Sequence, residues 1–317
     1  MKVAVIIPCF NVETHVGSAV RSALEQTHTD LDIIAVDDGS TDGTREVLES
    51  LARSSNGRFR WIGRANLGAC SARNAGVSDT QGVYIQFLDA DDTLERDKIE
   101  RQVALARANE YAELVIGGFR NRFENGKDEV VLPLVGQPWA ALVRTRMGTT
   151  SSNLFKREAV NGVRGWNERQ RSSQDYELMF RILAAGGRVA WDNAVASTVL
   201  KRASGSISKT DERDNWVRYL DLRRAMRDHM VRIDPQGFKS EIEVADQYLF
   251  MAIRVLSKHD PDAAAKEFDR TLDRAFVPDR TKATTAAYIF FYRVFGFRVA
   301  ERFALAIARS RHRVKAG

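Results

Sequence analysis

The sequence predicts an α/β protein with a doubly wound, mainly parallel β-sheet and a helical extension at the C-terminal end. Through roughly the first third of the chain, short apolar runs alternate with segments whose apolar residues recur at helical spacing. This rhythm is typical of a parallel sheet that is covered on both faces. Beyond about Asp211 the strand-like runs stop and only helical patterns remain. We therefore expect a first domain over residues 1–212 and a helical region over residues 213–317.

The expected strands of the first domain are short and nearly continuous apolar runs, as in strands buried on both faces. After the first strand, the segment 12–26 places Val16, Val20 and Ala23 on one face of a helix. The second strand runs into Asp37-Asp38-Gly39-Ser40-Thr41, which predicts a turn followed by a helix to about residue 53. The strands are expected at 3–7, 33–36, 59–62 and 83–88, and a further helix at 69–78.

The second half of the chain continues this alternation less regularly before it becomes helical. Asn125-Gly126 lies within 124–128 and predicts a hairpin turn, because Asn-Gly supplies the positive φ angles that such turns need. The rhythm changes near residues 203–214, where we expect the domain boundary. Helices are expected at 96–109, 174–185, 216–230, 242–257, 263–275 and 284–308, with strands at 114–117 and 188–191.

The composition is that of an ordinary soluble protein, with 44% hydrophobic and 28% charged residues, and it excludes the disordered and fibrous classes. The net charge is +6, and basic residues become denser toward the C-terminus. Because these residues follow no recognised reader motif, we do not expect nucleic acid as a partner.

The cysteines and the apolar segments indicate the cellular compartment of the protein. Cys9 and Cys70 show neither a pairing pattern nor metal-ligand spacing, which is typical of a reducing compartment. The apolar run before Pro8 is too short for a signal peptide, and no run reaches the ~18–20 residues of a membrane span. We therefore expect a cytoplasmic protein.

Carboxylates gather just after the fourth expected strand, at Asp89, Asp91 and Asp92. Because they repel one another, a divalent cation or several hydrogen-bond donors must offset their charge. This oxygen-rich set suits Mg²⁺ or Mn²⁺ holding a diphosphate. The alternative is that Asp91, Asp92 and Thr93 only cap a helix that starts near Glu95, since Asp and Thr are common capping residues.

Polar clusters also follow the first three strands, at residues 8–11, 37–40 and 64–68. In an open α/β sheet the carboxyl ends of the strands converge on one crevice, so we expect these clusters to face the carboxylates. Together they offer an aromatic face for a base, carboxylates for base or ribose, and cations for phosphate. Each cluster alone could be structural, and residues 37–40 could be just a turn and a helix cap.

The order of these motifs resembles one known family over roughly residues 1–205. The motifs are Pro8-Cys9-Phe10-Asn11, Gln26-Thr27, Asp37-Asp38-Gly39-Ser40-Thr41-Asp42-Gly43-Thr44, Asn66-Leu67-Gly68, Ala72-Arg73-Asn74-Ala75-Gly76 and Phe87-Leu88-Asp89-Ala90-Asp91-Asp92. In this combination the chain resembles the family 2 glycosyltransferases, which are inverting enzymes with the nucleotide-diphospho-sugar transferase fold of type A.

The resemblance implies a role for particular residues of these motifs. It implies that Asp91 is the direct ligand of Mn²⁺ or Mg²⁺ and that Asp89 contacts the nucleotide. It also implies that Asp38 accepts a hydrogen bond from the base and that Arg73 lies near the nucleotide. The nucleoside would be bordered by Pro8, Phe10 and Glu13.

A later segment, Gly165-Trp166-Asn167-Glu168 followed by residues 173–178, resembles the acceptor side of the same family. Inverting transfer needs a base that deprotonates the acceptor hydroxyl on the face opposite the departing nucleotide. The resemblance assigns this role to Asp175, next to Gln174, which stands where many relatives carry an acidic residue. The alternative is that Asp175 only stabilises a helix N-terminus.

Leu200-Lys201-Arg202 and residues 204–208 resemble a late family segment that often reads Tyr-Arg-x-His, but this chain has no histidine there. Arg202 could reach a phosphate or be an ordinary exposed arginine.

The last helical segment carries large apolar residues at helical spacing with arginines between them. Such a helix can pack against its neighbours or lie on an anionic membrane. The second possibility predicts peripheral contact with the inner membrane surface.

These patterns predict a metal-dependent inverting glycosyltransferase that uses a nucleotide-diphosphate sugar, with UDP favoured by its prevalence in the family. The acceptor is expected to be a hydroxyl of a carbohydrate or a lipid-linked molecule, in cell-surface polysaccharide or glycolipid synthesis. The alternative is a catalytically silent nucleotide-sugar-binding subunit. The presence of both Asp91 and Asp175 favours the enzyme, because a binding module needs no acceptor-side base.

Overall fold

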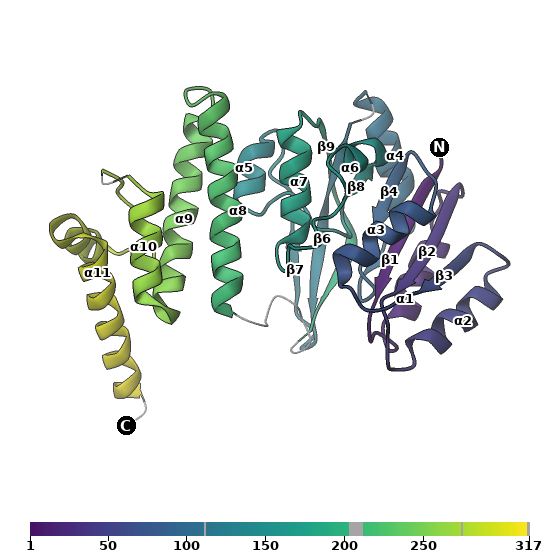
Figure 1. Ribbon diagram of the computed structural model, residues 1–317, viewed down its shortest axis with the longest axis horizontal. Helices are drawn as coiled ribbons and strands as arrows, with labels where there is room; N and C mark the ends of the chain where they lie inside the picture. Colours follow the sequence, from purple (N-terminus) through teal and green to yellow (C-terminus); the bar gives the residue numbers. More distant parts are fainter. Residues whose placement is uncertain (111, 203–211, 274, 316–317) are drawn as a thin grey trace. The chain divides into compact units, whose positions relative to one another are not determined.

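The computed structural model describes residues 1–110, 112–202, 212–273 and 275–315, and the chain divides into two compact units (Figure 1). The first unit is Met1–Ile207 and the second is Ser208–Gly317. The predicted boundary at residues 212 and 213 stays a prediction, because residues 203–211 lie outside the described part of the chain.

The first unit is built on one mixed sheet with the strand order β3-β2-β1-β4-β8-β6-β9-β5, and β7 pairs with β6. β1 pairs in parallel with β2 and with β4, and β2 pairs in parallel with β3. This part confirms the predicted doubly wound, mainly parallel sheet, and antiparallel pairs join β8 to β4 and to β6. The strands are β1 (Val3–Cys9), β2 (Leu31–Asp37), β3 (Phe59–Gly63), β4 (Tyr84–Phe87), β5 (Thr93–Leu94), β6 (Leu114–Phe123), β7 (Asp128–Val131), β8 (Leu154–Lys156) and β9 (Val189–Lys201).

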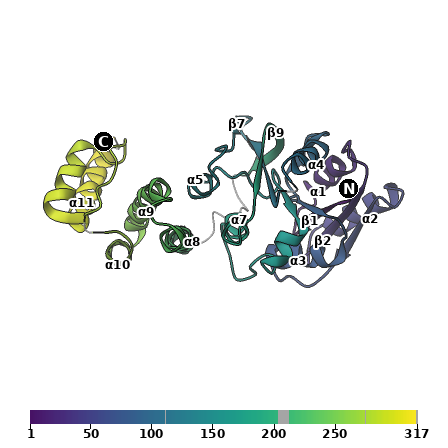
Figure 2. The ribbon, with the colours of Figure 1, turned by 90° about the horizontal axis from the view of Figure 1, so that it is seen from above.

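Helices cover both faces of the parallel strands, and Figure 2 shows α1 and α4 on one side of β1 and α3 on the other. The side chains of Val3, Val5 and Ile7 in β1 share a core with residues of α1 and α4. On the opposite face α3 approaches so closely that a Cβ on Gly76 would lie 2.3 Å from Ile6 Cγ2. The helices are α1 (Val16–Leu24), α2 (Thr44–Ser54), α3 (Ala69–Asp79), α4 (Lys98–Ala108), α5 (Pro138–Val143), α6 (Arg157–Gly162) and α7 (Gln174–Ala184).

The later strands are longer than the sequence predicts. β9 runs for 13 residues, and its register with β6 shifts at Gly117 and Gly118. Beyond Trp191 this strand has no continuous apolar run, so its extent depends on pairing with β6 rather than on local pattern. The predicted hairpin turn is confirmed, because Phe123 N–H donates to the Lys127 carbonyl at 2.9 Å and β7 follows.

The second unit is helical, as predicted, and has a core of its own. Phe250 lies near its centre, with ring contacts to Phe276, Tyr288, Tyr292 and Phe297. In the described part of the chain, no helix is both long and apolar enough to cross a membrane. The helices are α8 (Glu212–Ile233), α9 (Lys239–His259), α10 (Pro261–Thr271) and α11 (Ala286–Lys315), which is kinked at Gly296.

Candidate active site

The strand order reverses between β1 and β4, and this point organises the candidate site. After β1 the chain moves outward to β2 and β3, then returns to add β4 on the other side of β1. In open α/β sheets, ligands bind outside the carboxyl ends of the strands at such a reversal. Pro8 lies at the carboxyl end of β1, and Asp38 and Asp89 follow the carboxyl ends of β2 and β4.

The loops after β1 and β2 are joined by hydrogen bonds. Asn11, at φ 52°, accepts a hydrogen bond on Oδ1 from Thr41 N–H at 2.8 Å. The Glu13 carboxylate accepts from Gly43 N–H at 2.7 Å, at the start of α2. Glu13 therefore fixes a helix N-terminus, and the nucleoside contact predicted for it stays a prediction.

Phe10 and Leu67 are large apolar side chains that this part of the site leaves exposed, at 48% and 66%. Between their loops lies Asp38, whose buried carboxylate accepts from Leu67 N–H at 3.1 Å and from Gly68 N–H at 2.7 Å. Arg64 Nε lies 3.5 Å from the same carboxylate. Asp38 thus shapes the loop after β3, and its predicted bond to a base stays a prediction.

The carboxylates that follow β4 separate into two roles. Asp92 is buried and accepts from Ser151 Oγ at 2.6 Å and from Leu200 N–H at 3.1 Å. Ser151 Oγ in turn accepts from Asp89 N–H at 3.1 Å. The structure does not support the capping alternative, because α4 begins only at Lys98 and has no side-chain cap. Asp92 instead ties the end of β4 to β9.

Asp89 and Asp91 carry the charge that faces the site. Asp91 Oδ2 lies 2.9 Å from Arg202 Nη2, and Asp89 Oδ1 lies 2.6 Å from Arg73 Nη2. Burial raises the pKa of Asp91, and the negative charge of Asp89 adds to this rise. The charges of Arg202 and His15 act in the opposite direction. The carboxylates are therefore crowded, as the sequence predicts, and arginines offset part of their repulsion.

Arg73 connects Asp89, after β4, to Gln174 at the start of α7. Its Nη2 binds Asp89, and its Nη1 donates to Gln174 Oε1 at 3.0 Å. The guanidinium carbon lies 4.5 Å from the ring centroid of Trp166, which packs edge-on against Phe87 of β4. Since Arg73 is buried, these contacts hold α3, the end of β4 and the start of α7 in one arrangement.

Asp175 lies in the first turn of α7, beside the partner of Arg73. Its Oδ1 accepts from Tyr176 N–H at 2.9 Å, which is what the helix-stabilising alternative requires. Within the described residues its Oδ2 makes no hydrogen bond, so a lone pair is available to a substrate hydroxyl. Burial raises the pKa of Asp175, and the nearby charges of Asp89 and Arg73 also act on it.

Some residues of the site were missed by sequence reasoning. The sequence does not decide the role of Arg202, although its segment resembles a family motif. Ser151 lies in no motif, and its bond to Asp92 spans 59 residues, so no local signal could have found it. Residues 204–208 of the late segment lie outside the described part of the chain.

The donor set at the end of β4 fits a hard divalent cation that is shared with a ligand. Among the described residues, no group of three or more His, Cys, Asp or Glu side chains could hold a metal by itself. Mg²⁺ is commonly held by one or two carboxylates together with substrate phosphates, and Mn²⁺ also suits oxygen ligands. Asp89 and Asp91 supply such a carboxylate pair.

Comparison with known families identifies the first unit. The family model described as Glycosyl transferase family 2 matches residues 4–175. A chondroitin synthase of Pasteurella multocida (strain Pm70) is 30% identical over 213 residues, which are 66% of this chain and 22% of that protein. The chain spans only about a fifth to a third of the length of the first curated relatives that it matches.

Solved structures share the fold at low sequence identity. Staphylococcus aureus TarS 1–349 in complex with UDP-GlcNAc has a TM-score of 0.59 and 14% identity, covering 98% of this chain and 92% of that chain. The mannosyltransferase PcManGT of Pyrobaculum calidifontis, in complex with GDP-Man and Mn²⁺, has a TM-score of 0.58 and 19% identity, covering 96% and 86%. Both confirm the predicted fold class.

Proposed function

Because this chain belongs to glycosyl transferase family 2, we propose that it transfers a sugar from a nucleoside-diphosphate sugar to a hydroxyl acceptor, with inversion at the anomeric carbon. The observation that carries the proposal is the bridge through Arg73, which binds Asp89 on one side and Gln174 on the other. Gln174 precedes Asp175, so the proposed base follows a residue that Arg73 joins to Asp89, which supports the proposal.

The donor is proposed to be a UDP-sugar. The exposed ring of Phe10 and the exposed Leu67 side chain can cover the faces of a base, and Asp38 lies behind the same loop. The two structural neighbours are complexes with UDP-GlcNAc and with GDP-Man, which supports a nucleotide sugar as donor. UDP itself is favoured by its prevalence in the family.

Asp91 is proposed to hold Mn²⁺ or Mg²⁺ together with the diphosphate of the donor, and Asp89 to contact the nucleotide. When bound, this cation would stabilise the negative charge that develops on the leaving diphosphate. Arg202 lies against Asp91 and can add positive charge beside the same phosphates. The Mn²⁺ in the PcManGT complex supports this assignment.

Asp175 is proposed as the base. The acceptor hydroxyl gives its proton to Asp175 Oδ2 while its oxygen forms the bond to the anomeric carbon. The bond from that carbon to the phosphate oxygen breaks, and the nucleoside diphosphate leaves with the electron pair. A carboxylate whose pKa is raised by burial is a stronger base than an ordinary aspartate, which suits this role.

The acceptor is proposed to be a carbohydrate or a lipid-linked molecule of cell-surface polysaccharide or glycolipid synthesis, and the working location the cytoplasm. The polysaccharide synthase among the relatives supports the first class of acceptor.

Release of nucleoside diphosphate from the donor, measured with and without Mn²⁺, tests the proposal. Activity should require the metal and should collapse in Asp91→Ala, whereas Asp175→Asn should bind donor normally in calorimetry and lose transfer. Equal turnover without metal would contradict the metal assignment, and unchanged transfer in Asp175→Asn would remove the base. Donor binding without turnover across an acceptor panel would indicate the silent subunit.

A further inference from the structure

One face of α11 exposes large apolar side chains on both sides of the kink at Gly296. The exposed fractions are 62% for Phe290, 55% for Phe295 and 42% for Phe303. The ring of Phe291 contacts all of these rings, with centroid distances of 5.9 Å, 5.9 Å and 4.3 Å. We call this surface the α11 apolar face; its exposed members are Phe290, Phe295 and Phe303, which the ring of Phe291 joins.

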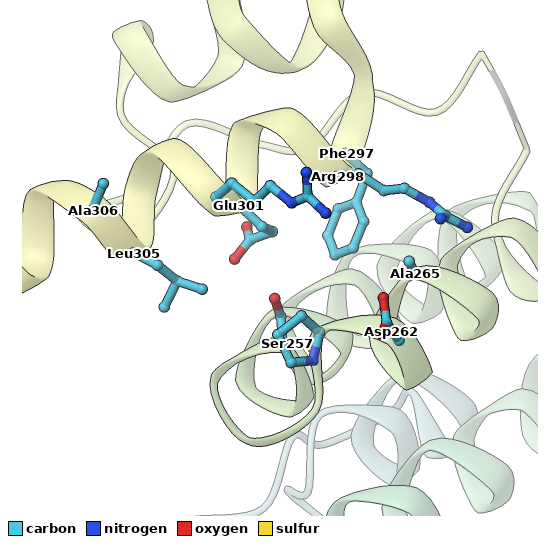
Figure 3. Close-up of a pocket in the computed structure, with 10 residues that line it drawn as sticks. Ser257, Asp262, Ala265, Phe297, Arg298, Glu301, Leu305 and Ala306 are labelled. Atoms are coloured by element: carbon cyan, nitrogen blue, oxygen red, sulfur yellow. The ribbon is translucent and has the colours of Figure 1, made fainter.

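The opposite face of α11 already supplies the core of the unit. Tyr288, Tyr292 and Phe297 are buried, and Glu301 accepts from Arg254 Nε and from the Tyr288 hydroxyl. Figure 3 shows Phe297 and Glu301 beside a pocket of about 400 Å³ that residues of α9 and α10 also line. The α11 apolar face is therefore additional to the packing of this unit.

The exposed charged side chains that accompany the α11 apolar face are basic. Arg293 and Arg302 are exposed, and Arg302 also lines the pocket of Figure 3; within the described part of the chain, neither makes an ion pair or a side-chain hydrogen bond. From residue 286 to residue 317 the only acidic residue is Glu301, which is buried against Arg254. The sequence continues with further basic residues at 309, 311, 313 and 315.

We propose that the α11 apolar face docks on an anionic lipid membrane, with the helix lying in the plane of the surface. Exposed phenylalanines that enter the acyl boundary, with basic side chains beside them, are typical of helices that bind membranes in this way. A symmetric second copy is disfavoured, because its α11 would offer these arginines no exposed acidic partner, Glu301 being buried. The inference goes beyond the proposed function and does not depend on it.

Flotation of the full chain with vesicles tests this proposal. The chain should float with vesicles of equal parts phosphatidylcholine and phosphatidylglycerol and remain unbound with phosphatidylcholine alone. Phe290→Ser with Phe295→Ser should weaken binding more than roughly tenfold, since both rings lose their apolar burial. Arg293→Glu with Arg302→Glu should weaken it to a similar degree, since attraction to the anionic surface is reversed.

Arg53→Glu with Arg107→Glu is the matched control, because it makes the same change of net charge on exposed positions of α2 and α4. This control should bind almost as the unaltered chain does, and thermal unfolding should show that all variants are folded. Equal loss of binding in the control, or binding unchanged in both α11 variants, would overturn the proposal. Light scattering that shows a dimer abolished by the phenylalanine variant would assign the face to a second copy instead.

Discussion

Replacing Arg73 with Met tests whether the bridge from Asp89 through Arg73 to Gln174 acts in sugar transfer or only stabilises the fold. Arg73 has a side chain only 7% exposed, while its partner Asp89 is 37% exposed, so the charge left behind can be partly solvated. The change removes charge-assisted bonds to Asp89 and Gln174, each worth about 1.5–3 kcal/mol at most. With solvation of Asp89 offsetting part of this loss, we expect a net cost of about 2–4 kcal/mol.

The effect on transfer should be larger than the effect on folding. Without the bridge, no hydrogen bond through Arg73 holds the start of α7 beside the end of β4. A displacement of a reacting group by about 1 Å can lower the reaction rate by about 100-fold. We therefore expect kcat to fall by roughly 100-fold and the midpoint of thermal unfolding by roughly 5–12 °C. Arg73→Lys should have a kcat and an unfolding midpoint between those of the unaltered chain and those of Arg73→Met. An ammonium group cannot span both Asp89 and Gln174 in the way a guanidinium does.

Arg227→Met is the matched control in the helical unit. Arg227 is partly buried at 24% exposure, and its Nε lies 2.9 Å from Asp246. This variant should lose stability and keep its transfer rate. Steady-state kinetics at saturating donor, together with thermal unfolding, measure both quantities. If Arg73→Met kept kcat within about threefold while losing stability, the bridge would be structural only and the reasoning would be refuted.

Other consequences can be checked separately. Ser151→Ala should cost about 1–3 kcal/mol, since it removes a donor from buried Asp92. Because burial raises the pKa of Asp92, the stability that this group contributes is present below its ordinary pKa and lost as the pH rises. Urea unfolding should therefore show that Ser151→Ala lowers the free energy of unfolding more at neutral pH than at about pH 4. An equal loss at both pH values would contradict this account. The acid limb of the kcat profile should lie above the ordinary carboxylate pKa of about 3.9, because burial raises the pKa of Asp175. Arg202→Met should raise the donor KM roughly tenfold, because a positive charge beside the phosphates is lost. It should change the free energy of unfolding by less than about 1 kcal/mol, because the pair of Arg202 with Asp91 is partly exposed. An unchanged KM would remove Arg202 from the phosphate site.

The early strands and helices could be predicted from sequence because their signals are local. β1 and β2 are almost wholly buried, so their residues must be apolar on both faces and the runs are continuous. α1 buries Val16, Val20 and Ala23, the residues whose helical spacing predicted it. The start of β9 was predicted at 188–191, but its full length and the short helices α5 and α6 were not, since they depend on pairing and packing with distant residues.

For the candidate site, the sequence shows which chemical groups are present and predicts that most of them follow the ends of parallel strands. It could not decide which carboxylate faces solvent: Asp91 and Asp92 are neighbours, yet Asp92 is buried against Ser151 and Leu200 while Asp91 meets Arg202.

The contact between Arg73 and Gln174 spans 101 residues, and only the tertiary structure decided it. The physical reason is that strand and helix periodicity is imposed by neighbouring residues along the chain. Partners across the site are selected instead by the tertiary packing that brings α3 and α7 together, and no spacing in the sequence encodes that packing.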